Sequence, residues 1–263
     1  MKARLCQLIL ALALATPAVA QVTASSYIVI AQDGSVLAER NADTMRPMAS
    51  ITKLVTLGEL KPADNQVFIT AEEKDTLKGT RMRLRMGSYT QSDLFAAALI
   101  SSNNEAAKAV GRSVPNLIAD VNKKNLERGL QLSVVEPSGL DPANMGTARS
   151  LAKLAWVLKD EPSAAMSVSH SGRLAGHSTN SLLSSKGWEF ALSKTGYIKE
   201  AGGCLVTLTK MGGQWVAVAV MGSKSVRERW IDLARIRKQV APADTFYEPG
   251  IKVASAKKRR RTA

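Results

Sequence analysis

Segments with the pattern of β-strands lie at the two ends of the sequence, and helical patterns fill the middle. The strand-like runs are residues 27–31, 36–38, 190–195, 203–209 and 215–221. Asp33-Gly34 and Gly212-Gly213 separate neighbouring runs, and such dipeptides are typical of tight hairpin turns. Because a hairpin pairs its strands antiparallel, we expect one antiparallel sheet built from both termini. A helical cluster is then inserted between its two halves, which makes the fold α+β.

The middle of the chain carries apolar residues at helical spacing. The expected helices are residues 48–60, 90–101, 105–110, 117–128 and 147–158, with a last helix at 226–240. Thr90 and Asp93 form a capping pair at the start of the second of these. Residues 61–90 read as irregular or strand-like, and residues 172–187 read as a polar loop. No linker or repeat divides the chain, so residues 21–245 are predicted to form one domain.

The N-terminus has the layout of a secretory signal peptide. Lys2 and Arg4 precede an apolar run at 5–15, and Ala18 and Ala20 occupy the −3 and −1 positions of a cleavage site. The run is shorter than the roughly 20 apolar residues that a transmembrane helix needs. We therefore predict a signal peptide at residues 1–20 and an exported protein, located in the periplasm or cell-wall space and soluble or peripherally attached to the membrane.

The sequence is strongly basic, with a formal net charge of +14. Five consecutive basic residues at 257–261 lie in what we expect to be a flexible tail, residues 246–263. Such a balance favours polyanionic partners. Nucleic acid does not fit an export signal, so the prediction is contact of the tail with an anionic membrane or wall polymer.

Ser50 and Lys53 form an S-x-x-K motif at the start of the first expected helix. Residues three apart lie on one face of a helix, so the hydroxyl and the amine are neighbours. A neutral amine can accept the serine proton and so activate it as a nucleophile. Taken alone the motif is weak, because Ser150 begins a second copy in this chain and Ser255 a third.

Two further motifs follow in the chain and make the first one informative. Ser102 and Asn104 belong to an S-x-N placed between two expected helices, where a hydroxyl and an amide can project into a cleft. Lys194, Thr195 and Gly196 form a K-T-G at the end of a strand-like run. The order S-x-x-K, S-x-N, K-T-G is associated with β-lactamases and penicillin-binding proteins.

The chain resembles the low-molecular-mass penicillin-binding proteins, which are serine D-alanyl-D-alanine peptidases. The matching segments include residues 47–54, 136–140 and 194–206, and the likeness extends over about residues 25–235. Residues 197–206 most resemble the single-domain D-alanyl-D-alanine endopeptidase branch. The resemblance implies a β-lactamase/transpeptidase-like fold and hydrolysis of D-Ala-containing peptide bonds in peptidoglycan stem peptides. It leaves open whether the chain is an endopeptidase or a carboxypeptidase.

The resemblance also implies roles for the motif residues. Ser50 attacks the peptide carbonyl to form an acyl-enzyme, and Lys53 accepts its proton. Ser102 relays a proton toward the leaving amine, while Asn104 orients Lys53 and the substrate amide. Lys194 sets the local electrostatic field and binds a substrate carboxylate.

The strand carrying the third motif is expected to bind substrate as well. Thr195 hydrogen-bonds the substrate carboxylate, and Gly196 lets the substrate backbone approach the strand edge. The backbone N–H groups of Ser50 and Tyr197 form an oxyanion hole. The resemblance implies no metal and no cofactor, and it implies that β-lactam antibiotics acylate Ser50.

Two alternatives compete with a peptidase. A β-lactamase shares the three motifs and needs a base for deacylation, a role that Glu136 could fill. However, Leu140 stands where the β-lactamase pattern has Asn. The second alternative is an inactive wall-binding protein that kept the fold, although all three motifs are intact.

Overall fold

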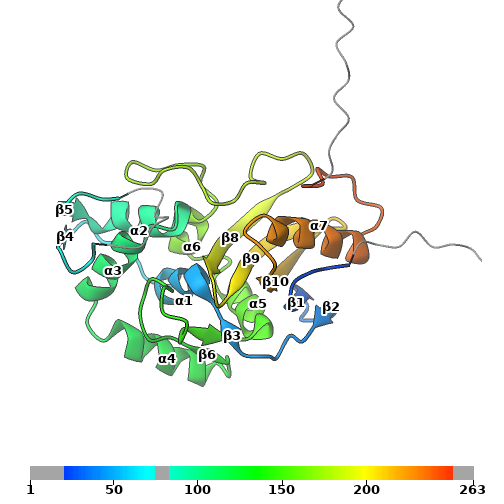
Figure 1. The fold of residues 1–263 in the computed structure, drawn as a ribbon, viewed down its shortest axis with the longest axis horizontal. Coiled ribbons are helices and arrows are strands. Elements are labelled where there is room, and N and C mark those ends of the chain that lie inside the picture. Colours follow the sequence, from blue (N-terminus) through cyan, green and yellow to red (C-terminus); the bar gives the residue numbers. More distant parts are fainter. Residues whose placement is uncertain (1–20, 75–82, 251–263) are drawn as a thin grey trace, which may run out of the picture.

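The computed structural model describes residues 21–74 and 83–250, and its centre is a five-stranded antiparallel sheet (Figure 1). Its strands are β1 (Ser26–Ala31), β2 (Val36–Arg40), β8 (Phe190–Ile198), β9 (Gly202–Met211) and β10 (Gln214–Ser223). They lie in the order β2-β1-β10-β9-β8, so the N-terminal hairpin pairs with the C-terminal strands. This confirms the predicted sheet built from both ends of the chain. The predicted signal peptide lies outside the described residues.

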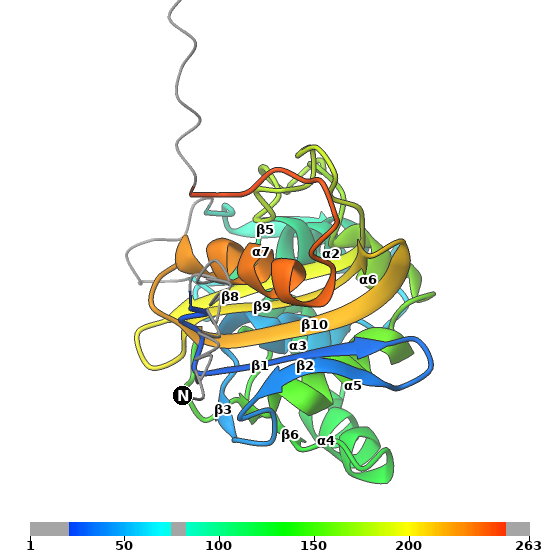
Figure 2. The same ribbon diagram turned by 90° about the vertical axis from the view of Figure 1, so that its right-hand side faces the viewer.

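Both faces of the sheet are covered, because alternate residues of its strands enter two different cores. In β1, Ile28 and Ile30 pack into the core shared with the helical cluster. Tyr27 and Val29 point to the opposite face, where they pack with Trp230 and other residues of the C-terminal helix α7 (Glu228–Val240). Figure 2 shows α7 lying across that face. A strand buried on both sides reads as a continuous apolar run, which is why β1 is so easy to find in the sequence.

The helices of the middle region form a cluster beside the sheet (Figure 1). They are a 3₁₀ turn η1 (Ala49–Ile51), α1 (Thr52–Leu57), α2 (Gln91–Ile100), α3 (Asn104–Ser113), α4 (Leu117–Glu127), α5 (Ala148–Val157) and α6 (Pro162–Met166), followed near the C-terminus by α7 (Glu228–Val240). The predicted cap of α2 is present, since the Asp93 amide donates to Thr90 Oγ1 at 3.2 Å. Within the described ranges, no helix is both long and apolar enough to cross a membrane.

Short strands outside the main sheet have the weakest pattern in the sequence. β4 (Gln66–Ile69) and β5 (Gly87–Thr90) form a hairpin within the region expected to be irregular or strand-like. β3 (Arg46–Pro47), β6 (Leu132–Ser133) and β7 (Met145–Gly146) form a small separate sheet that was not predicted. A strand of two residues is too short to show alternation of apolar and polar residues. Such strands are recognised only by their pairing with residues far away in the sequence.

The packed part of the chain continues past residue 245, although residues 246–263 were predicted to form a flexible tail. Phe246 is buried and meets Trp188 edge-on, with ring centroids 5.1 Å apart. The Trp188 indole donates to the Tyr247 carbonyl at 2.8 Å, and Glu248 pairs with Lys238 at 3.0 Å. Residues 246–248 therefore belong to the folded domain. The basic run at 257–261 lies outside the described residues.

Candidate active site

Ser50 lies in η1, the 3₁₀ turn that leads into α1 and packs against β8. The preceding residue Ala49 has a φ of 49°, a left-handed conformation that costs a non-glycine residue about 1 kcal/mol or more. Gly196 of β8 lies against the same turn, and a Cβ added there would be 3.0 Å from the Ser50 backbone nitrogen. The K-T-G strand thus approaches the nucleophile's backbone closely, and only a glycine leaves room for this contact.

Lys53 is fully buried and has the Ser50 hydroxyl within hydrogen-bond distance. Its Nζ lies 2.9 Å from Ser50 Oγ, 2.7 Å from Asn104 Oδ1 and 2.6 Å from the Ser138 carbonyl oxygen. The two acceptors besides serine come from α3 and from the loop between β6 and β7. They fix the amine against the hydroxyl, which is the geometry expected of a base and its nucleophile.

Asn104 reaches Lys53 because its neighbour caps α3. The Asn103 side chain accepts a hydrogen bond from the Ala106 amide at 2.8 Å and so occupies the N-cap position. Ser102, just before it, has a φ of 62°. These two conformations turn the chain sharply between α2 and α3, so Ser102 and Asn104 both enter the site that Lys53 occupies.

Lys194 is the second fully buried lysine of the site. Its Nζ donates to Ser102 Oγ at 2.7 Å and to the Thr195 carbonyl at 3.1 Å. Burial first, and then the positive charges of Lys53 and Arg229, lower the pKa of Lys194 well below its ordinary value. Lys194 and Ser102 thus form a hydrogen-bonded pair next to the positive charge of Lys53.

The structure therefore brings Lys53 into contact with both Ser50 and Asn104, and it brings Lys194 into contact with Ser102. Tyr197 continues the edge strand β8 and is 50% exposed. Thr195 contacts Lys194 through its carbonyl group. The roles of Thr195 and Tyr197 toward substrate stay predictions.

Two contributors to the site were missed in the sequence. Arg229, in the first turn of α7, is buried and donates from Nη1 to the Gly196 carbonyl at 3.0 Å. It holds the K-T-G strand and adds positive charge behind it. A lone arginine in an amphipathic helix carries no pattern that would reveal such a contact.

The second missed contributor is Ser138, whose backbone carbonyl binds Lys53. The carboxylate of Glu136 holds the loop that contains Ser138. Glu136 accepts hydrogen bonds from the Ser138 amide at 2.6 Å, the Leu140 amide at 2.8 Å and Asn144 Nδ2 at 2.8 Å. Both carboxylate oxygens are thus engaged within the loop. This favours a positioning role for Glu136 over that of the deacylating base of a β-lactamase.

The hydrogen bonds to Glu136 give its loop a specific pH dependence. Burial alone raises the pKa of Glu136, but the bonds from Ser138 and Asp141 and the charge of Lys53 outweigh it, so the pKa lies below its ordinary value of 4.5. A lowered folded-state pKa contributes stability that is present above the unfolded value and is lost as pH falls through the folded one.

We expect Glu136→Gln to lower the free energy of unfolding by about 2 kcal/mol at pH 7, because one oxygen becomes an N–H₂ facing an amide donor. The difference between wild type and variant should shrink as the pH is lowered below 4.5. Urea unfolding at several pH values measures it. A difference that stays constant down to pH 3 would show that the carboxylate charge is not what holds the loop.

The sequence of this chain is similar to those of known D-alanyl-D-alanine peptidases. The sequence profile of a family described as D-alanyl-D-alanine carboxypeptidase matches residues 13–225. A D-alanyl-D-alanine endopeptidase of Pseudomonas aeruginosa is 31% identical over 234 residues, which span 81% of this chain and 76% of that protein. A D-alanyl-D-alanine endopeptidase of Escherichia coli is 29% identical over 245 residues, spanning 86% and 79% respectively.

Solved structures show the same fold. Penicillin-binding protein D2 of Listeria monocytogenes, determined with bound cefotaxime, matches this chain with a TM-score of 0.72 at 24% sequence identity. The match covers 83% of this chain and 97% of that one. The predicted β-lactamase/transpeptidase-like architecture is confirmed by this likeness.

Proposed function

The chain belongs to the D-alanyl-D-alanine carboxypeptidase family of peptidases, and on that premise we propose that it hydrolyses D-Ala-containing peptide bonds of peptidoglycan through an acyl-enzyme on Ser50. The observation that carries the proposal is the contact of the buried Lys53 amine with Ser50 Oγ at 2.9 Å. In the proposed reaction this amine accepts the serine proton, a role that requires its neutral form.

The proposed reaction begins with attack of Ser50 Oγ on the carbonyl carbon, as its proton passes to Lys53. The backbone N–H groups of Ser50 and Tyr197 stabilise the resulting oxyanion, with about 3 kcal/mol expected per donor. The C–N bond then breaks, and the leaving amine takes a proton delivered through Ser102. Water hydrolyses the acyl-enzyme by the same route in reverse, which restores the free hydroxyl.

We favour an endopeptidase acting on crosslinks over a carboxypeptidase. The support is that curated relatives named D-alanyl-D-alanine endopeptidase align with most of this chain. Carboxypeptidase activity is the alternative, because the family's own description names it. Both reactions use the same acyl-enzyme and differ only in what leaves.

Purified muropeptides separate the two activities. We expect the protein without residues 1–20 to convert crosslinked dimers into monomers faster than it releases D-Ala from uncrosslinked pentapeptides. Liquid chromatography with mass detection follows both products in one reaction. Release of D-Ala alone would assign the carboxypeptidase activity, and no cleavage of either substrate would leave the inactive wall-binding alternative.

We further propose that the protein is exported after removal of residues 1–20, and that the basic run at 257–261 contacts an anionic membrane or wall polymer. The support is the signal-peptide pattern of residues 1–20 and the run of basic residues that follows the folded domain in the sequence. N-terminal sequencing of the cellular protein should start at Gln21, and deletion of 251–263 should lower its retention on anionic vesicles.

A further inference from the structure

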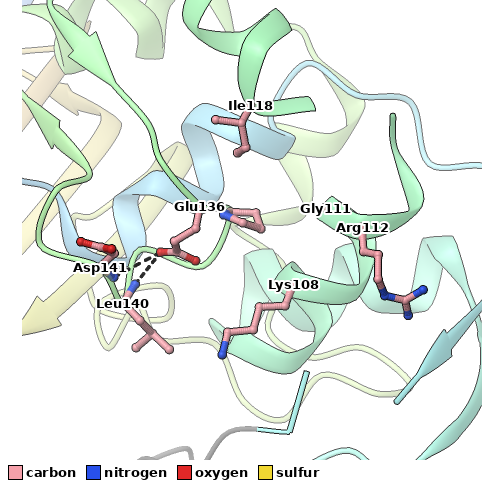
Figure 3. Close-up of a pocket in the computed structure, with 8 residues that line it drawn as sticks. Lys108, Gly111, Arg112, Ile118, Glu136, Leu140 and Asp141 are labelled. Atoms are coloured by element: carbon pink, nitrogen blue, oxygen red, sulfur yellow. Dashed lines mark hydrogen bonds between the residues drawn. The ribbon is translucent and has the colours of Figure 1, made fainter. Parts of the chain in front are cut away.

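A pocket of about 480 Å³ lies between α3 and the loop that carries Ser138, and no step of the proposed reaction uses it (Figure 3). Its walls are mostly apolar, formed by Ile118, Pro137, Leu140 and the backbone at Gly111. The Lys108 side chain extends from α3 (Figure 3), and Lys108 and Leu140 both line the pocket. We call this site the Lys108 groove.

Three of the four charged side chains that line the Lys108 groove have hydrogen-bond partners in the part of the chain that the structure describes. The Arg112 guanidinium binds Glu73 at 2.5 Å and the Phe68 carbonyl at 2.6 Å. Glu136 is held by its own loop, and Asp141 accepts from the Ala143 amide at 2.8 Å.

Lys108 itself has no ion pair or hydrogen bond within residues 21–74 and 83–250. In Figure 3 the Asp141 carboxylate lies on the far side of Glu136 from Lys108. The groove therefore combines mostly apolar walls with the Lys108 ammonium and with the carboxylates of Glu136 and Asp141, which backbone amides bind.

The groove adjoins the active site on the Lys53 side. Lys108 is four residues after Asn104 on α3, so both lie on one face of that helix, about 6 Å apart along its axis. Pro137 precedes Ser138, whose carbonyl binds Lys53. Lys194 does not line the groove, and it donates a hydrogen bond to Ser102 of the active site. A peptide that points its carboxyl end toward Lys194 would have its acyl-donating part toward Asn104 and the groove.

We propose that the Lys108 groove binds an aliphatic side chain that ends in a carboxylate, carried by the stem-peptide residue that precedes the D-Ala acylating Ser50. This inference rests on the proposed function and names a specificity determinant for it. Methylene groups match the walls at Ile118, Pro137 and Leu140, and the carboxylate pairs with Lys108. The groove thus distinguishes diamino acids with a terminal carboxylate from those without one.

Two synthetic crosslinked dimers test the proposal. In the acyl-donating strand, one carries meso-diaminopimelate as its third residue and the other carries lysine, whose side chain lacks the carboxylate. We expect the wild type to cleave the first with the higher kcat/KM. In Lys108→Gln, the ratio of the two kcat/KM values should fall about tenfold, mainly through KM, as expected for losing one charge-assisted hydrogen bond. In Lys108→Glu, the ratio should fall further and invert.

The matched control is Lys123→Gln, which removes an exposed lysine of α4, and its ratio should equal that of the wild type. Thermal unfolding of each variant checks that it is folded. A ratio unchanged in both Lys108 variants would overturn the inference while leaving the peptidase function intact. Failure of the wild type to cleave either dimer would instead overturn the endopeptidase activity, and with it this inference, whereas D-Ala release from uncrosslinked pentapeptides tests the peptidase function separately.

Discussion

Ser50→Ala should abolish covalent labelling by a fluorescent penicillin and lower kcat for D-Ala peptide cleavage by at least about 10³-fold. Penicillin resembles an acyl-D-Ala-D-Ala peptide, so the hydroxyl that attacks the peptide should also open the β-lactam ring. In the structure, Ser50 Oγ is the hydroxyl that the buried Lys53 amine contacts. Removal of one oxygen leaves the lysine bonded to Asn104 and Ser138, so the fold should be retained.

The chain supplies its own control in a second S-x-x-K motif. Ser150 accepts a hydrogen bond from the Gln131 amide at 2.8 Å, and Lys153 is exposed to solvent. Ser150→Ala should therefore label like the wild type, at some cost in stability. Gel fluorescence and intact mass show whether the wild type, Ser50→Ala and Ser150→Ala become labelled. Labelling of Ser50→Ala, or an unlabelled wild type, would remove Ser50 from its proposed role.

The parts of the site that could be predicted from sequence are those fixed by short-range geometry. Ser50 and Lys53 are three residues apart at a helix start, so their contact follows from the helical turn. The Ser102 and Asn104 pair was expected at a junction of two helices, and the structure places it there. Lys194 was expected on a strand, and β8 is the edge strand of the sheet.

The parts that could not be predicted depend on backbone groups and on distant contacts. Lys53 binds the backbone carbonyl of Ser138. Every residue has such a carbonyl group, so no residue type in the sequence indicates this contact. Glu136 suggested a catalytic base by its side chain, whereas its loop uses the carboxylate to bind backbone amides. Arg229 reaches β8 from a helix more than thirty residues away in sequence. Only the folded chain brings these groups together.

Gly139→Ala should destabilise the protein by about 3 kcal/mol, which for a domain of this size lowers Tm by roughly 10 °C. Gly139 has a φ of 78°, which costs alanine about 1 kcal/mol. A Cβ at this position would also lie 2.0 Å from the Ala49 carbonyl oxygen and 2.9 Å from the Ser50 nitrogen. Since both contacts are backbone atoms, the loop must shift, and the neighbouring Ser138 carbonyl then moves away from Lys53.

Gly213→Ala separates the collision from the backbone strain. Gly213 has nearly the same φ, 77°, but nothing lies within 4 Å of an added Cβ in its hairpin turn. This control should therefore lose only about 1 kcal/mol and retain penicillin labelling. Thermal unfolding compares the stabilities of the two variants, and the rate of penicillin labelling compares their active sites. We expect Gly139→Ala to label much more slowly than Gly213→Ala. Equal losses in the two variants would mean that the contact between Gly139 and the Ser50 turn does not position the nucleophile.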